Sequence, residues 1–71
     1  MMQTVAIGGL GAIGLKLARA LDRGVDGLRL AAVSARDQAK AEANLRGFRA
    51  PPRVVSLDRL AEADIVVEAA P

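Results

Sequence analysis

Three glycines in the segment Gly9–Gly14 have the residue type and spacing of a phosphate-binding turn. The segment reads G-x-G-x-x-G and directly follows a short apolar run. A glycine turn that opens a helix presents backbone N–H groups to an anion without side chains in the way. We interpret Gly9 as the tight turn, Gly11 as the point of close approach to a dinucleotide pyrophosphate, and Gly14 as the contact between helix and sheet. A turn required only for packing is the alternative.

The residues that would select the cofactor are expected about twenty positions after the last glycine, at the end of the next strand. Ser34 and Arg36 stand there, and a hydroxyl beside a guanidinium suits the 2′-phosphate of NADP. Asp37 comes later and is better placed as a helix cap. The sequence therefore favours NADP over NAD. Two alternatives stay open: Arg36 as a solvated surface charge, and Asp37 reaching the ribose of NAD.

A third group of candidates follows the last apolar run, Ile65–Val67. Ligands of open α/β sheets bind beside the carboxyl ends of the strands, so Glu68 is expected to face the cofactor or to cap a following helix. Ala69 and Ala70 are small enough to let the backbone run close to the pyrophosphate or the nicotinamide.

The residue types that the sequence lacks exclude several other kinds of chemistry. It contains no cysteine and no histidine, which removes disulfides, thiolate nucleophiles, Cys/His metal sites and the commonest general base. Phe48 is its single aromatic residue and the net charge is only +2, so a base-stacking nucleic-acid surface is not expected. No signal peptide or membrane span is recognisable, and we expect a cytoplasmic chain.

The elements that must position these residues alternate along the chain. β-branched apolar runs predict buried strands, and apolar residues at helical spacing predict amphipathic helices. The predicted strands are 4–7, 28–33, 53–56 and 65–67, and the predicted helices are 12–23, 37–46 and 58–63.

This β-α-β-α-β-α-β order predicts an α/β fold with a Rossmann-like, doubly wound parallel sheet in the strand order 3-2-1-4. The sheet would be incomplete, because its second half would begin where the sequence stops. We therefore expect residues 1–71 to be a partial N-terminal dinucleotide-binding domain, with the catalytic C-terminal domain absent. A self-sufficient small domain, or a subunit completed by oligomerisation, is the alternative.

Three segments together resemble the aspartate dehydrogenase family: Val5–Gly14, Leu30–Asp37 and Asp64–Ala70. The resemblance implies NAD(P)-dependent oxidation of L-aspartate to iminoaspartate, which serves NAD biosynthesis or hydrolyses to oxaloacetate and ammonia. It also implies a homo-oligomer whose substrate-binding and catalytic residues, including a histidine, lie in a C-terminal domain. The cofactor-binding residues that it transfers to this sequence are Gly9, Gly11, Ala12, Ile13 and Gly14 at the phosphates, Ser34 and Arg36 at the adenosine, and Glu68, Ala69 and Ala70 near the nicotinamide.

Two other functions remain possible from the sequence. The glycine segment is shared by many dehydrogenases, so homoserine dehydrogenase and sugar dehydrogenases are alternatives within the same class. A regulatory domain that senses NAD(H) through a conformational change, and catalyses nothing, is an alternative from another class.

Overall fold

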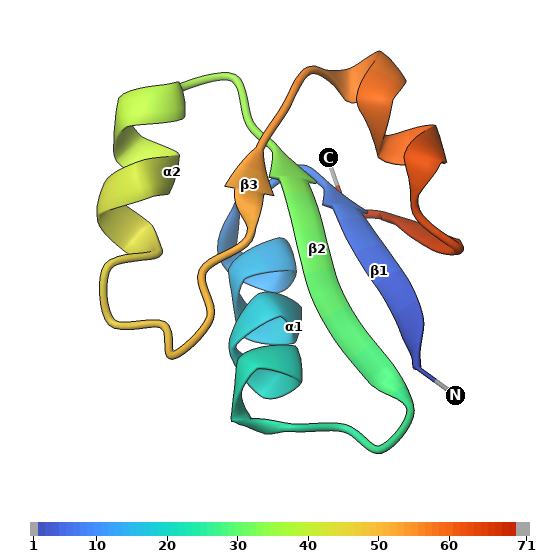
Figure 1. Cartoon of the computed structure of the whole chain (residues 1–71). Helices are drawn as coiled ribbons and strands as arrows, with labels where there is room; N and C mark the ends of the chain where they lie inside the picture. The colour runs from blue at the N-terminus through green and yellow to red at the C-terminus, as the bar shows by residue number, and fades with distance from the viewer. Residues whose placement is uncertain (1, 70–71) are drawn as a thin grey trace.

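The chain alternates between strands and helical segments (Figure 1). The computed structural model describes residues 2–69. Its elements are β1 (Gln3–Gly8), α1 (Ala12–Arg23), β2 (Leu28–Ser34), α2 (Gln38–Asn44), β3 (Arg53–Val54), the 3₁₀ helix η1 (Leu57–Glu62) and β4 (Ile65–Glu68). The predicted β-α-β-α-β-α-β order is confirmed.

The strands form one parallel sheet in the order β3-β2-β1-β4. This is the predicted 3-2-1-4 order of an incomplete Rossmann-like sheet. Because β1 lies between β2 and β4, the turn that follows β1 is flanked by the ends of both neighbours. All strand carboxyl ends lie at one edge of the sheet, the upper edge in Figure 1.

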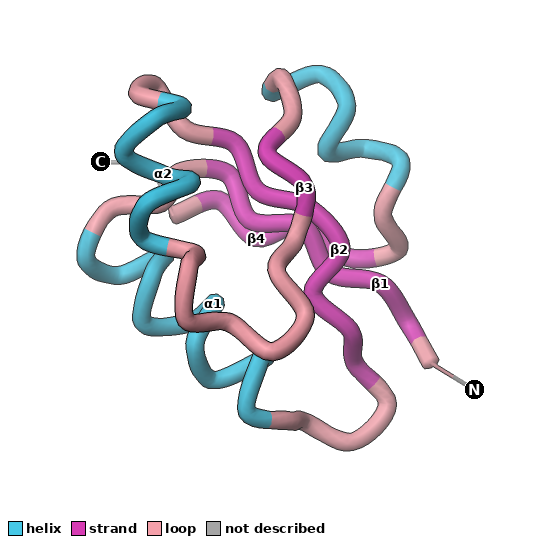
Figure 2. The backbone as a smooth tube through the Cα atoms, turned by 60° about the vertical axis from the view of Figure 1, so that its left-hand side comes forward, coloured by secondary structure: helices cyan, strands magenta, loops and turns pink. Residues whose placement is uncertain are grey.

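Helices α1 and α2 cover the same face of the sheet, and η1 lies on the other face (Figure 2). Right-handed crossovers from β1 to β2 and from β2 to β3 place both helices on one side. The apolar face of α1 repeats at helical spacing, and its Ala18 and Leu21 are buried. The main core lies between these helices and the sheet. Its buried members are Val5, Ile7, Leu10, Ala18, Leu21, Leu30, Val33, Ala41 and Leu45. Leu60 of η1 is buried on the opposite face.

An irregularity in β2 aligns its apolar side chains with the helices. The pairing of β1 with β2 shifts between Val5 and Ala6, where Ala31 is an extra residue on β2. In a regular strand, residues three apart point to opposite faces. The shift lets Leu30 and Val33 both contribute to the core beneath α1.

The predicted helix 12–23 is confirmed, whereas each of the other predicted elements differs from the structure by one or more residues at an end. Strand β3 covers Arg53–Val54 instead of 53–56, although the amide of Val55 still donates to the carbonyl of Val33 at 2.8 Å. Helix α2 covers Gln38–Asn44 instead of 37–46, because its end tightens into i→i−3 hydrogen bonds from Leu45 and Arg46. The third helix is a 3₁₀ helix over Leu57–Glu62, one residue earlier than predicted.

The carboxylate of Asp22 connects α1 to the loop that leads into β3. It accepts hydrogen bonds from the backbone amides of Arg49 at 2.9 Å and Ala50 at 3.0 Å. These two amides hold the pKa of Asp22 below its ordinary value. The loop is thereby fixed against the carboxyl-terminal half of α1.

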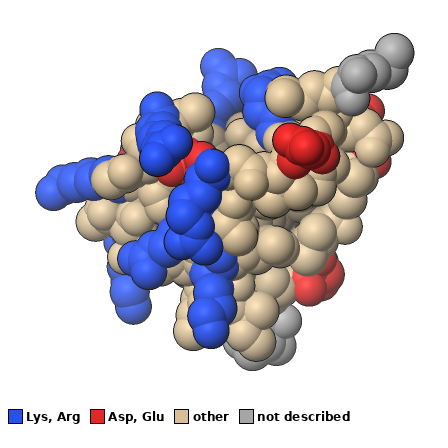
Figure 3. Space-filling view, turned by 90° about the horizontal axis from the view of Figure 1, so that it is seen from below, with Lys and Arg blue, Asp and Glu red and all other residues tan. Residues whose placement is uncertain are grey.

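Basic side chains gather on the side of the molecule where the strands begin. Figure 3 shows this side, with several Lys and Arg side chains close together. It is opposite the edge at which the glycine turn lies. Within residues 2–69, none of the helices is both long enough and apolar enough to cross a membrane.

Candidate dinucleotide-binding site

The turn between β1 and α1 depends on the backbone freedom of Gly9. Gly9 has a φ of 98°, a left-handed conformation that residues with a Cβ rarely adopt. Its amide donates to the carbonyl oxygen of Ser34 at 3.0 Å, which ties the turn to the end of β2. The predicted tight turn is present, and it is fixed to the neighbouring strand.

Gly11 and Gly14 are required for different reasons. A Cβ on Gly14 would collide with the carbonyl oxygen of Gly9 and lie 3.1 Å from its carbonyl carbon. A Cβ on Gly11 would meet no protein atom within 4 Å, and its φ of −79° is accessible to any residue. The fold therefore needs a glycine at position 14 but has no steric need for one at position 11. Open space beside Gly11 is what a ligand passing close to the backbone would need.

The first turn of α1 faces this open space and is free of competing groups. Gly11 is the N-cap residue, and no side chain caps the helix there. The first turn contains no acidic residue, and Ala12 and Ile13 are exposed. Uncapped N–H groups and the positive end of the helix dipole attract an anion. The residues present therefore fit a pyrophosphate.

A hollow of about 200 Å³ lies between the glycine turn and α2. It is lined by Gly9, Leu10, Gly11, Ala35, Arg36, Asp37, Lys40, Ala41 and Asn44. Arg36 is exposed at this hollow, as expected for a residue that contacts the adenosine end of a cofactor. Ser34 is only 7% exposed and is not among the lining residues. The structure thus places Ser34 at the base of the turn and Arg36 at its open side.

Asp37 caps α2, as the sequence predicts. Its Oδ1 accepts a hydrogen bond from the backbone amide of Lys40 at 3.0 Å. This bond satisfies an amide that the helix itself leaves without a partner. Asp37 also borders the hollow, but one of its oxygens is already occupied by the cap.

The end of β4 completes the site on the other side of β1. Glu68 pairs with Gly8 in the parallel ladder, and its Oε1 lies 3.0 Å from the position a Cβ on Gly8 would take. The amide of Ala69 donates to the carbonyl of Gly8 at 2.8 Å. The methyl group of Ala69 lies 3.4 Å from the position of a Cβ on Gly14. A larger residue at position 69 would therefore press on the first turn of α1.

The structure brings most of the predicted residues together at one edge of the sheet. The turn residues, Arg36 and the residues ending β4 all lie at the carboxyl ends of β1, β2 and β4. Ala70 and the possible capping of a following helix by Glu68 lie outside the described residues. Lys40 and Asn44 also line the hollow but were not predicted from the sequence. The feature that could have indicated them is their spacing of four residues, which places them on one face of the helix that follows Arg36.

Comparison with known proteins agrees with this geometry. Residues 9–71 match the family described as homoserine dehydrogenase, NAD binding domain. An L-aspartate dehydrogenase of Bradyrhizobium diazoefficiens is 60% identical over 68 residues, which are 94% of this chain and 24% of the relative. An L-aspartate dehydrogenase of Methanocella arvoryzae is 43% identical over 97% of this chain and 26% of the relative. In Bordetella bronchiseptica, L-aspartate dehydrogenase 3 is 48% identical over 94% of this chain and 25% of the relative.

The chain spans about a quarter of the length of these curated relatives. No solved structure matches it significantly.

Proposed function

Because the chain belongs to the family of homoserine dehydrogenase NAD-binding domains, we propose that its glycine turn holds the pyrophosphate of NAD(P). Gly9, Gly11, Ala12, Ile13 and Gly14 are the residues we assign to this contact. One observation carries the assignment: the space beside Gly11 is open, whereas the space beside Gly14 is closed by the Gly9 carbonyl. Backbone N–H groups of the first turn of α1 would donate to the phosphate oxygens.

We assign the remaining contacts from their place around the turn. Glu68, Ala69 and Ala70 would lie toward the nicotinamide half, since β4 follows β1 on that side of the sheet. The hydrogen bond from Ala69 to Gly8 supports this placement for Ala69. Arg36 and Ser34 would lie toward the adenosine half, at the end of β2.

We also propose that NADP is preferred over NAD. Arg36 is exposed at the hollow beside the turn, where its guanidinium can donate to a 2′-phosphate. An NAD-selective site would use a carboxylate at the ribose hydroxyls. The nearest carboxylate, Asp37, has an oxygen bound to the amide of Lys40, which supports its role as a helix cap.

We propose that the protein to which this chain belongs is an L-aspartate dehydrogenase. The names of three relatives, at 43–60% identity, support this choice over homoserine and sugar dehydrogenases. When bound, the cofactor would supply the hydride chemistry for the oxidation of aspartate. The part played by this chain is to bind the cofactor and orient it, and residues outside the chain would bind aspartate and move its protons.

Three further proposals follow from the same resemblance. Residues 1–71 would form the N-terminal cofactor-binding part of a longer protein, which agrees with their coverage of about a quarter of each relative. That protein would be a homo-oligomer. It would act in the cytoplasm.

Turnover measurements test the proposed activity. The 71-residue chain alone should show no aspartate-dependent reduction of NAD or NADP, because it contains no histidine and, on this proposal, the residues that bind aspartate lie outside it. A chimera that joins it to the remaining part of the Bradyrhizobium relative should reduce NAD(P) with aspartate. Homoserine and glucose serve as competing substrates in the same assay. Turnover by the chain alone, or a chimera that prefers homoserine, would contradict the assignment.

A further inference from the structure

The hollow beside the glycine turn combines an apolar floor with a basic rim. Leu10 and Ala41 are buried, and Ala35 is half-buried, so the floor is made of aliphatic side chains. Arg36 and Lys40 are both exposed at the rim. An aliphatic floor next to two cations suits a ligand that joins a flat or apolar group to an anion.

Helix α2 fixes Lys40 at this rim. Ala41 is only 2% exposed and contributes to the main core, so the face of α2 that carries it is turned toward the sheet and α1. Lys40 precedes Ala41, and its backbone amide is held by Oδ1 of Asp37 at 3.0 Å. This cap fixes the backbone between Asp37 and Lys40.

The two cations are available for a ligand. Within residues 2–69, the single ion pair is Arg59–Glu62, so neither Arg36 nor Lys40 is paired with a carboxylate there. Asp37 also lines the hollow and offsets one positive charge. A single cation beside Asp37 would leave the rim neutral, whereas the two together leave it at +1.

We propose that Lys40 is a second specificity-determining residue, which joins Arg36 in binding the adenosine 2′-phosphate of NADP. The proposal rests on the proposed function, since it concerns the same dinucleotide. A phosphate monoester carries a charge of about −1.5 to −2 and three strong acceptor oxygens at neutral pH. Arg36 alone cannot balance that charge next to Asp37. Lys40 supplies a compact charge that complements the planar guanidinium.

Removing the lysine charge should therefore change cofactor choice without changing the fold. Lys40→Gln should weaken NADPH binding about fivefold to twentyfold and change NADH binding less than twofold, because NADH lacks the 2′-phosphate. Lys40→Arg should restore most of the preference, since it restores the charge. Lys40 is exposed, and only its backbone amide donates to the Asp37 cap of α2, so these variants should unfold at the same denaturant concentration as the wild type.

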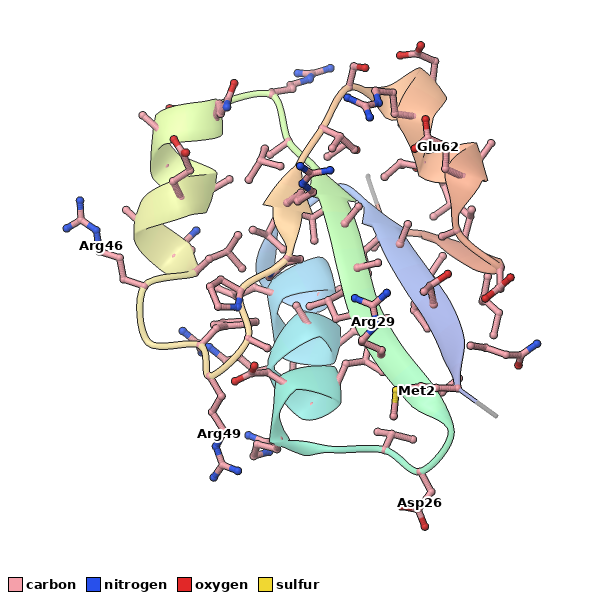
Figure 4. All side chains as sticks on the ribbon, viewed as in Figure 1. Met2, Asp26, Arg29, Arg46, Arg49 and Glu62 are labelled. Carbon is pink, nitrogen blue, oxygen red and sulfur yellow. The ribbon has the colours of Figure 1, made fainter. Side chains whose placement is uncertain are left out.

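A matched control separates this local effect from the general charge of the molecule. Arg46 is an exposed cation shortly after the end of α2, and its side chain extends away from the rest of the molecule (Figure 4). It does not line the hollow. Arg46→Gln removes the same charge as Lys40→Gln and should leave the NADPH/NADH affinity ratio unchanged.

The test is titration of the chimera with the Bradyrhizobium relative, carrying the wild-type sequence or each variant within residues 1–71, with NADPH and NADH, followed by fluorescence. The proposal is supported if the NADPH/NADH affinity ratio falls in Lys40→Gln, recovers in Lys40→Arg and is unchanged in Arg46→Gln. If both coenzymes bind and Lys40→Gln leaves their ratio unchanged, Lys40 has no role in specificity, while the proposed function stands. A ratio that falls equally in both Gln variants reveals a general charge effect and overturns the proposal. If neither coenzyme binds the chimera with the wild-type residues 1–71, the proposed function fails together with this inference.

Discussion

Thr4 and Asp64, which are 60 residues apart, are joined by reciprocal hydrogen bonds where β1 and β4 begin. The Thr4 amide and hydroxyl donate to Oδ2 of Asp64 at 2.8 and 3.1 Å, and the Asp64 amide donates to the Thr4 hydroxyl oxygen at 3.0 Å. The next residues, Val5 and Ile65, begin the parallel pairing that ends at Gly8 and Glu68. This contact therefore fixes the register that brings the end of β4 beside the glycine turn.

The Thr4–Asp64 contact makes stability depend on pH. The two Thr4 donors, the backbone amide first and then the hydroxyl, hold the pKa of Asp64 below its ordinary value in the folded state. A carboxyl group whose pKa is lower in the folded state than in the unfolded state stabilises the fold. This stabilisation is fully present above the pKa in the unfolded state, about 3.9, and is lost as the pH falls through the pKa in the folded state. We expect Asp64→Asn to unfold at a lower urea concentration than the wild type at pH 7. The difference between the two unfolding midpoints should become smaller near pH 2, where Asp64 of the wild type is protonated.

Urea unfolding at several pH values measures this effect. Asp26→Asn is the control, because Asp26 lies in the exposed loop between α1 and β2 (Figure 4). Equal losses of stability in the two variants at neutral pH would show that the contact with Thr4 contributes nothing.

Gly14→Ala should damage the fold. The new methyl group would meet the backbone carbonyl of Gly9, so either the helix or the turn would have to shift. Overpacking of this kind costs typically about 1–3 kcal/mol. Chemical denaturation of the variant should show this loss with or without a cofactor. An unchanged unfolding midpoint would show that α1 can move away from the turn at little cost.

The order of strands and the glycine turn were predictable from sequence because each rests on local patterns. Short apolar runs alternate with helical spacing, and the handedness of crossovers then leaves few arrangements of the sheet. Gly9, Gly11 and Gly14 follow the first run at the spacing that a phosphate-binding turn needs. The role of Asp37 as a cap was predictable for the same reason, since it immediately precedes a run of helix-forming residues.

The structural features that could not be predicted from the sequence depend on contacts between residues far apart in the chain. The Thr4–Asp64 contact joins two ends of the chain, and Ala31 becomes an extra residue only against β1. Ser34 is buried at the end of β2, where its carbonyl accepts from the Gly9 amide, so its hydroxyl is less available to a cofactor than its position suggested. Lys40 enters the site only because α2 turns its Ala41 face toward the core.

Cofactor preference should respond to the residues that end β2. A charge-assisted hydrogen bond to the 2′-phosphate is worth about 1.5–3 kcal/mol. We therefore expect Arg36→Ala to weaken NADP binding by about tenfold to a hundredfold and NAD binding much less. Ser34→Asp should shift the preference further, because a carboxylate repels the 2′-phosphate and accepts from the ribose hydroxyls of NAD.

The NADP/NAD affinity ratio, measured at two salt concentrations, checks this prediction. Higher salt should weaken NADP binding more than NAD binding, because the additional contact is electrostatic. If the wild type, Arg36→Ala and Ser34→Asp all have the same ratio, Arg36 is only a surface charge. The better interpretation is then that the site binds NAD, with Asp37 at the ribose.

The measurement that tests the central claim most directly is calorimetric titration of the wild-type chain and Gly11→Ala with NADPH. The methyl group would occupy space that no protein atom within 4 Å uses, at a φ of −79° that alanine adopts freely. The fold should therefore be retained, with any loss of stability from the N-cap position below about 1 kcal/mol. We predict that affinity for NADPH falls more than tenfold, because on the proposed assignment the methyl group would stand where the pyrophosphate would pass. Equal affinities in two equally folded proteins would contradict the assignment of the glycine turn to the pyrophosphate.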